Sequence, residues 1–180
     1  MVKIGDEFSN AASGERYVFR QTGAETDGTL VVMDDYLGPG TEGPLAHVHP
    51  RQEERFIARS GRLGVRLGDR DHLLVAGKEI TAGPGVPHKI RNAGSDDLHI
   101  TVEMRPALRF AQFLETTAAL THGKGGAGRT FNLFEGALLM CEFGDEIRPA
   151  RPSLLVQRVV FPILAIVGRV LGYRLAPSPP

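Results

Sequence analysis

The sequence has one cysteine, no excess of charge of either sign and no uncharged stretch long enough to span a bilayer. The lone cysteine, Cys141, excludes an internal disulfide framework and favours a reducing cytoplasm. Lysine and arginine together number 21, as do aspartate and glutamate, and no basic tract indicates nucleic-acid binding. The start of the chain also lacks the charged and apolar regions of a signal peptide. We therefore expect a cytoplasmic protein that does not bind nucleic acid.

What the sequence does contain is a series of short alternating segments between turns rich in glycine and proline. Apolar and polar residues alternate over residues 62–67 and again over 98–105, as in strands with one buried face. In the second segment the pattern does not decide whether His99 and Glu103 point inward, where Glu103 would be a second acid near a site, or outward, which we favour. In a chain of 180 residues that is 42% apolar, this repetition predicts a mainly β protein with an antiparallel barrel or jelly roll.

The pattern changes at Pro106, where apolar residues begin to recur at helical spacing. Residues 106–121 and 130–147 are predicted to form amphipathic helices, the first opened by the proline. Between them, residues 123–128 fit the letters of a nucleotide-binding glycine motif. No strand precedes this motif and no βαβ unit surrounds it, so we interpret it as an interhelical loop.

Two regions follow from this change of pattern. We expect a β-barrel over residues 1–105, with an N-terminal arm over about residues 1–15. Residues 106–180 should form a helical extension packed on the barrel or on a dimer partner.

An apolar run over residues 153–167 has two interpretations. Ten uncharged residues separate Arg158 from Arg169, which is short of the ~20 needed to cross a bilayer. The run could pack on the barrel, on a neighbouring helix or against a second copy of the chain. The alternatives are a helix lying in a membrane interface and an apolar lid over a substrate. Because the run lacks a strongly charged opposite face, we favour packing and, with the N-terminal arm, expect a homodimer.

Three histidines and one glutamate in two segments have the character of metal ligands: His47, His49, Glu54 and His88. His47 and His49 are two residues apart, so on a strand both side chains leave the same face. A hairpin after them would bring Glu54 opposite the histidines, whereas Glu53 would face solvent. Imidazole and carboxylate groups bind divalent zinc, iron, manganese, nickel and copper. We predict a site for one divalent ion of this group.

The second segment presents His88 from a tight turn. Residues 83–85, with the sequence Gly-Pro-Gly, force the turn. Pro87 biases Val86 towards extended geometry, so that His88 begins a strand. Asn92, four residues later, shares the face of His88. The residues expected around the metal and along the pocket are Phe56, Val65, Leu67, Ile90 and Asn92.

These two segments resemble the two sequence motifs of the cupin superfamily. The first motif is matched by His47-x-His49-x4-Glu54-x6-Gly61, and the second by Gly77-x5-Gly83-x-Gly85-x2-His88-x3-Asn92. The sequence departs from the first motif at Thr41, where a glycine is usual, and from the second at Gly83, where a proline is usual. The resemblance covers about residues 28–106. It implies a jelly-roll barrel of the RmlC-like type, to which some bacterial single-domain cupins append a helical tail.

The resemblance to quercetinase-like cupins also implies that Glu54 is both a metal ligand and a general base. Three hypotheses follow. The first, which we favour, is a metal-dependent oxygenase acting on an apolar, enolic or aromatic small molecule. The second is a non-oxidative enzyme in which zinc or a similar ion promotes isomerisation, cyclisation or dehydration of a polyketide-like intermediate. The third is a metal- or ligand-binding module without turnover.

Overall fold

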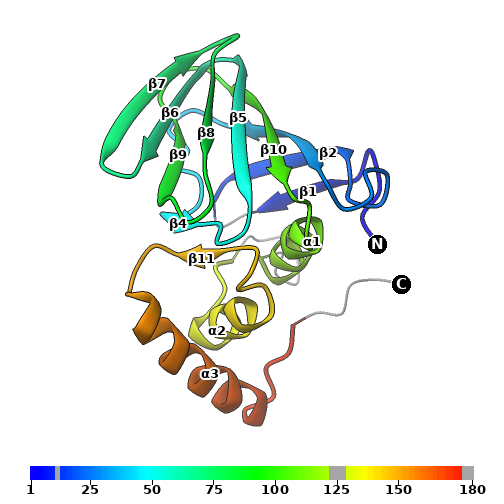
Figure 1. Ribbon diagram of the computed structural model, residues 1–180, viewed down its shortest axis with the longest axis vertical. Coiled ribbons are helices and arrows are strands. Elements are labelled where there is room, and N and C mark those ends of the chain that lie inside the picture. Colours follow the sequence, from blue (N-terminus) through cyan, green and yellow to red (C-terminus); the bar gives the residue numbers. More distant parts are fainter. Residues whose placement is uncertain (11–12, 122–128, 176–180) are drawn as a thin grey trace.

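The computed structural model describes residues 1–10, 13–121 and 129–175, in which two antiparallel β-sheets face each other and helices close one end (Figure 1). The strands are β1 (Glu7–Asn10), β2 (Glu15–Gln21), β3 (Val31–Leu37), β4 (His47–Val48), β5 (Glu53–Ser60), β6 (Arg62–Leu67), β7 (Arg70–Val75), β8 (Glu79–Ala82), β9 (His88–Asn92), β10 (Leu98–Arg105) and β11 (Arg148–Pro149). The helices are α1 (Phe110–Thr121), α2 (Leu133–Glu142) and α3 (Leu154–Val170). The predicted mainly β jelly-roll barrel with a helical extension is confirmed.

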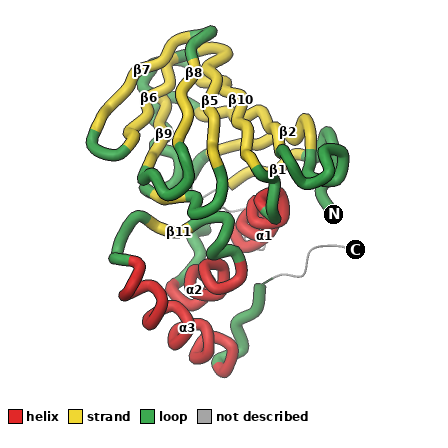
Figure 2. The backbone as a smooth tube through the Cα atoms, in the orientation of Figure 1, coloured by secondary structure: helices red, strands yellow, loops and turns green. Residues whose placement is uncertain are grey.

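Strands that are neighbours in a sheet are often distant from each other in the chain. One sheet has the order β1-β2-β3-β10-β5-β8 and the other has the order β11-β4-β9-β6-β7. The hydrophobic core lies between them and continues into the helices. Figure 2 shows the helices together at one end of the barrel, with the short strand β11 between the helices and the sheets.

The structure shows which face of strand β10 points into the barrel. The inward side chains, all buried, are Leu98, Ile100, Val102 and Met104. On the other face, His99 Nε2 lies 3.2 Å from Asp34 Oδ1, and Glu103 forms an ion pair with Arg55 at 3.3 Å. Glu103 is therefore held by an arginine on the outer face of the sheet, as we favoured, and does not contribute to an interior site.

The connection between β4 and β5 differs from the predicted hairpin. β4 pairs with β9 and β11, whereas β5 pairs with β8 and β10 in the other sheet. The turn before β5 therefore crosses from one sheet to the other. Gln52 fixes this crossing, since its buried amide donates to the carbonyl oxygens of Pro106 and Ala107 at 2.9 and 3.1 Å. Glu54 thus meets the histidines across the barrel interior and not along a ladder.

The helices are shorter than their sequence patterns predicted. Leu108 has a φ of 44°, in the left-handed region, so α1 begins at Phe110 and not at Pro106. α2 begins at Leu133, where Asn132 forms a capping box, and ends at Glu142 rather than at residue 147. The glycine-rich loop predicted at residues 123–128 lies outside the described residues.

α3 packs on α2, which is one of the arrangements predicted for the apolar run. Gly168 permits the contact, because a Cβ there would lie 3.0 Å from Phe134 Cβ. Pro162 stands inside the helix. No helix among the described residues combines the length and the apolarity that a bilayer crossing requires.

Candidate metal centre and cavity

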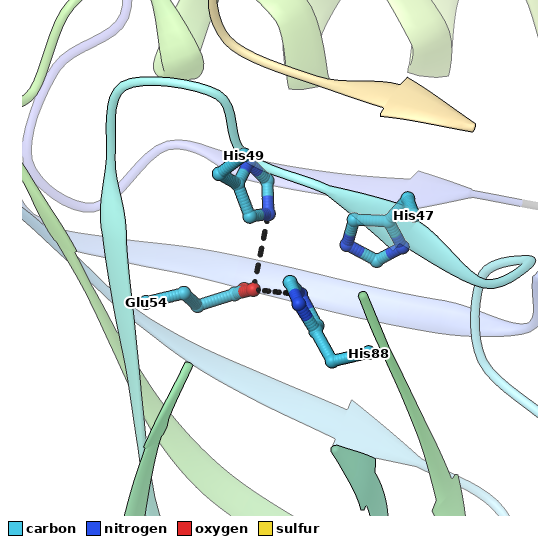
Figure 3. Close-up of side chains that lie close together, drawn as sticks. All are labelled: His47, His49, Glu54 and His88. Carbon is cyan, nitrogen blue, oxygen red and sulfur yellow. Dashed lines mark hydrogen bonds and ion pairs between the residues drawn. The ribbon is translucent and has the colours of Figure 1, made fainter. Parts of the chain in front are cut away.

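The four predicted ligands come from four places in the fold and meet in the barrel interior (Figure 3). His47 opens β4 and lies opposite His88 of β9 in the ladder, and His49 follows directly after β4. Glu54 enters from β5 of the facing sheet. One ligand atom from each residue lies within 4.8 Å of the other three, and all four residues are buried. Glu53, the competing carboxylate, is not part of this cluster.

Each histidine has its Nδ1 fixed by a backbone carbonyl. His47 Nδ1 lies 2.7 Å from the oxygen of Leu45, and His88 Nδ1 lies 2.9 Å from that of Val86. His49 Nδ1 lies 2.5 Å from the carbonyl oxygen of Glu146. A carbonyl oxygen only accepts, so each Nδ1 carries a proton and donates. In the neutral imidazoles, the lone pair is therefore on Nε2.

The Nε2 atoms face the carboxylate of Glu54. Glu54 Oε2 lies 2.7 Å from His88 Nε2 and 3.0 Å from His49 Nε2, and His49 Nε2 is buried without a hydrogen-bond partner. Three lone pairs and a carboxylate repel one another unless a cation lies among them. A proton on His88 Nε2 would compensate only the contact with Glu54. A divalent ion could instead bind all four ligand atoms. The donor set of three imidazoles and one carboxylate fits zinc and the first-row transition metals.

The electrostatics of the cluster keep His47 and Glu54 in metal-binding form. Burial lowers the pKa of His47 to about 3, with further lowering from His88 and His49, so its imidazole is neutral at pH 7. Burial alone would raise the pKa of Glu54, but the neighbouring His49 and His88 outweigh it and hold the pKa well below its usual range. Burial also lowers the pKa of His88, but the hydrogen bond and the charge of Glu54, with the hydrogen bond to the Val86 carbonyl, together outweigh it and raise the net pKa. A divalent ion would displace that proton.

A cavity of about 590 Å³ opens beside the cluster, and His47 and Glu54 form part of its wall. Its other walls are mostly apolar and come from both the barrel and the helices. Met33, Phe56 and Val102 line it from the barrel, and Phe110 and Leu139 line it from α1 and α2. This volume suits a small organic molecule.

The same cavity has a second polar region, which consists of Glu15, Tyr17 and Asp35. Tyr17 donates to Glu15 Oε2 at 2.6 Å, and Tyr17 and Asp35 are ladder partners. Glu15 and Asp35 lie on the paired strands β2 and β3, near enough that each carboxyl affects the pKa of the other. Asp35 is 1% exposed, and its Oδ1 has no hydrogen-bond partner among the described residues.

Burial is the main cause of the raised pKa of both acids. The pKa of Glu15 is raised to about 6, and that of Asp35 is raised well above its ordinary value, with the Glu54 carboxylate adding to both shifts. Neither carboxyl forms an ion pair with a lysine or arginine in the part of the chain that the structure describes. Both carboxyls are therefore protonated more readily than ordinary acids, in a wall that is otherwise apolar.

Only some of the predicted pocket residues line the cavity. Phe56 and Ile90 line the cavity, whereas Val65, Leu67 and Asn92 are not among its lining residues. The Asn92 amide instead donates to the carbonyl oxygens of Leu37, Gly38 and Asp96, which ties together two loops. Val65 is buried in the core between the sheets. These three residues therefore lie outside the lining of this cavity, and their expected role around the metal stays a prediction.

The acid pair and the helical wall were not among the predicted site residues. The alternation of Tyr17 and Phe19 extends back to Glu15, which places all three on one face of β2. Met33 and Leu37 likewise frame Asp35 on β3. The pattern was present in the sequence, but acidic residues on a core-facing side are unusual, and only pairing of the two strands brings them together.

Comparison with known proteins agrees with this fold. Residues 35–103 match the family described as Cupin domain. A predicted oxalate decarboxylase from Thermotoga maritima is 19% identical with a TM-score of 0.52, and the alignment covers 59% of this chain and 99% of that one. An RmlC-like cupin from Shewanella frigidimarina is 17% identical with a TM-score of 0.50, covering 62% and 93% respectively. No curated protein matches the chain.

Proposed function

Because its residues 35–103 make this chain a member of the cupin family, we propose that it is a metal-dependent enzyme acting on an apolar, enolic or aromatic small molecule. The observation that carries the proposal is the convergence of three Nε2 lone pairs and the Glu54 carboxylate at the wall of a largely apolar cavity. Helices α1 and α2 also belong to the proposed site, since both supply residues of the cavity wall.

His47, His49, Glu54 and His88 would hold the ion. When bound, a divalent ion supplies Lewis acidity that lowers the pKa of an enol or hydroxyl group, and a redox-active ion also exchanges electrons. Glu54 is held ionised and borders the cavity, so its carboxylate can accept the proton of such a hydroxyl. The aromatic and aliphatic walls orient an apolar substrate and exclude water.

The first form of the proposal is an oxygenase of the quercetinase-like kind. Its support is the combination of the four-ligand set with a cavity lined by Phe56, Phe110 and Phe113, which suits an aromatic or enolised substrate. A homodimer and a cytoplasmic location, expected from the sequence, stay predictions.

The second form is a non-oxidative isomerase, cyclase or dehydratase. The specific observation that favours it is the pair Glu15–Asp35, two buried acids with raised pKa values in the wall of the same cavity. A protonated carboxyl can act as a general acid towards a carbonyl or leaving hydroxyl while Glu54 acts as a base. Such a reaction needs no oxygen.

Elemental analysis of the purified protein tests the metal, with His88→Ala as the variant and His72→Ala as the matched control. His72 lies on β7, outside the ligand cluster. We expect near-stoichiometric divalent metal in the wild type and in His72→Ala, and a loss of at least roughly tenfold in His88→Ala. Iron, manganese, nickel or copper would favour the oxygenase, to be followed by measurement of oxygen uptake. Zinc would favour the non-oxidative form.

Two results would count against the proposal. Full metal occupancy in His88→Ala would remove the ligand assignment. A wild-type protein that takes up none of these metals, even when they are added to it, would leave only a ligand-binding module.

A further inference from the structure

One face of α3 exposes large apolar side chains along its whole length. The exposed apolar residues of the helix and of the position after it are Leu154, Leu155, Val156, Val159, Val160, Ile163, Ile166, Val167, Val170 and Leu171. The side that packs on α2 contains the residues of α3 that are buried, which are Gln157, Ala165 and Gly168. α3 is also the helix farthest from the barrel, so no other part of the described chain covers its outer face (Figure 1). A continuous apolar surface of this kind marks an interaction site.

The charge around α3 is of one sign. After Glu146 the sequence contains no aspartate or glutamate, although the whole chain has equal numbers of acidic and basic residues. The charged residues of this C-terminal part are Arg148, Arg151, Arg158, Arg169 and Arg174. Arg158 and Arg169 are about three turns apart on α3, so they lie along one edge of the exposed apolar face.

Three of these arginines line a groove between α2 and α3. Arg148, Arg158 and Arg169 all border the groove, which has a volume of about 460 Å³. Arg148 donates to the carbonyl oxygen of Gly144 at 2.6 Å. Among the described residues, Arg158 and Arg169 form no ion pair with a carboxylate, in contrast to Arg109, which binds Glu142 at 2.6 Å. The groove therefore offers unneutralised guanidinium groups beside an apolar helix face.

We propose that α3 lies in the surface of an anionic lipid bilayer, with its apolar face among the acyl chains and its arginine groove at the lipid phosphates. Guanidinium groups bind phosphate oxygens, and arginines at the edge of an apolar helix face lie at headgroup depth. A second copy of this chain fits less well, because pairing α3 with itself brings arginines together without any acidic residue on α3 to offset them. This proposal does not depend on the metal or on the reaction.

The experiment is flotation of the full chain with two kinds of vesicle, phosphatidylcholine alone and phosphatidylcholine mixed with phosphatidylglycerol. We expect binding to the mixed vesicles to be at least roughly tenfold tighter and to weaken as salt is added. Ile163→Glu, at the centre of the apolar face, should reduce binding by roughly tenfold or more. The double variant Arg158→Glu/Arg169→Glu should do the same through charge.

Matched controls lie at the opposite end of the molecule. Leu73→Glu and Arg70→Glu change exposed residues of β7 in the same way and should bind as the wild type does. Equal binding to both kinds of vesicle, no binding, or α3 variants that bind like the controls would overturn the proposal. Light scattering tests whether the apolar face of α3 forms a dimer instead. If the wild type is a dimer that Ile163→Glu dissociates, and if it binds neither kind of vesicle, the face binds a second copy of the chain.

Discussion

At the scale of single residues, the position of protons distinguishes the two polar regions of the cavity. Around His47, His49 and His88, each Nδ1 proton is held by a backbone carbonyl, which leaves the Nε2 lone pairs free to bind a cation. Glu15 and Asp35 form no ion pair with a lysine or arginine among the described residues, and burial raises the pKa of both carboxyls. The same barrel interior thus lowers the pKa of one carboxyl, Glu54, and raises the pKa of the other two.

The acid pair predicts a pH dependence of stability. Burial raises the pKa of Glu15 from 4.5 to about 6, so in this window the folded protein holds a proton that the unfolded chain has released. The contribution of Glu15 is fully present below pH 4.5 and is lost as pH rises through 6. We expect the free energy of unfolding to fall by about 2 kcal/mol over this window, relative to Glu15→Gln, in denaturant titrations at several pH values.

Glu53→Gln is the control for this measurement, because Glu53 lies next to Glu54 on β5 but outside the cavity lining. It should retain the wild-type pH profile. If Glu15→Gln and the wild type show parallel profiles between pH 4.5 and 7, the protonated pair is not a feature of the folded protein.

At the scale of elements, the helices are placed by specific contacts at their ends. Gln52 joins the turn before β5 to the turn before α1. Asn132 caps α2 by accepting from the backbone N–H groups of Phe134 and Glu135, and the Glu135 carboxylate accepts from the backbone N–H of Asn132. Since α2 contributes Leu139 and Met140 to the cavity wall, its N-terminal cap also supports the site.

Asn132→Ala should destabilise the protein by about 1 kcal/mol, because the two backbone donors at the start of α2 lose their acceptor. Asn132→Ser keeps a good capping oxygen and should recover most of that loss. Chemical denaturation of the two variants beside the wild type measures both effects. Equal stability of Asn132→Ala and the wild type would show that the capping box contributes little to the fold.

At the scale of the whole molecule, the four candidate metal ligands join both sheets and the helical part. β4 and β9 belong to one sheet and β5 to the other, and the carbonyl of Glu146 after α2 fixes His49. An ion bound by all four ligands would therefore connect three parts of the structure. Ions that bind the folded state and not the unfolded chain stabilise it by mass action.

Addition of zinc or manganese to metal-free protein should raise the midpoint of thermal unfolding. At a hundredfold excess over the dissociation constant, the expected stabilisation is ~2.7 kcal/mol. Magnesium should have little effect, because it prefers oxygen ligands. His47→Ala should not respond to zinc or manganese, and an unchanged zinc response in this variant would place the ion elsewhere.

The sequence by itself determined the candidate ligand set and the class of fold. The two-residue spacing of His47 and His49, the turn before His88 and the alternation in β10 are local properties, and local geometry fixes which residues share one side of a strand. Such patterns need no knowledge of the partner strand. They led to the mainly β barrel and to the four residues that the structure brings together.

Only the tertiary structure decided which surfaces face each other. It placed β4 and β5 in different sheets, so that Glu54 reaches the histidines across the interior. It paired β2 with β3, which joins Glu15 to Asp35, and it turned the arginines of α3 towards a groove on α2. These relations connect residues distant in sequence, and they depend on the packing of whole elements, which no local spacing encodes.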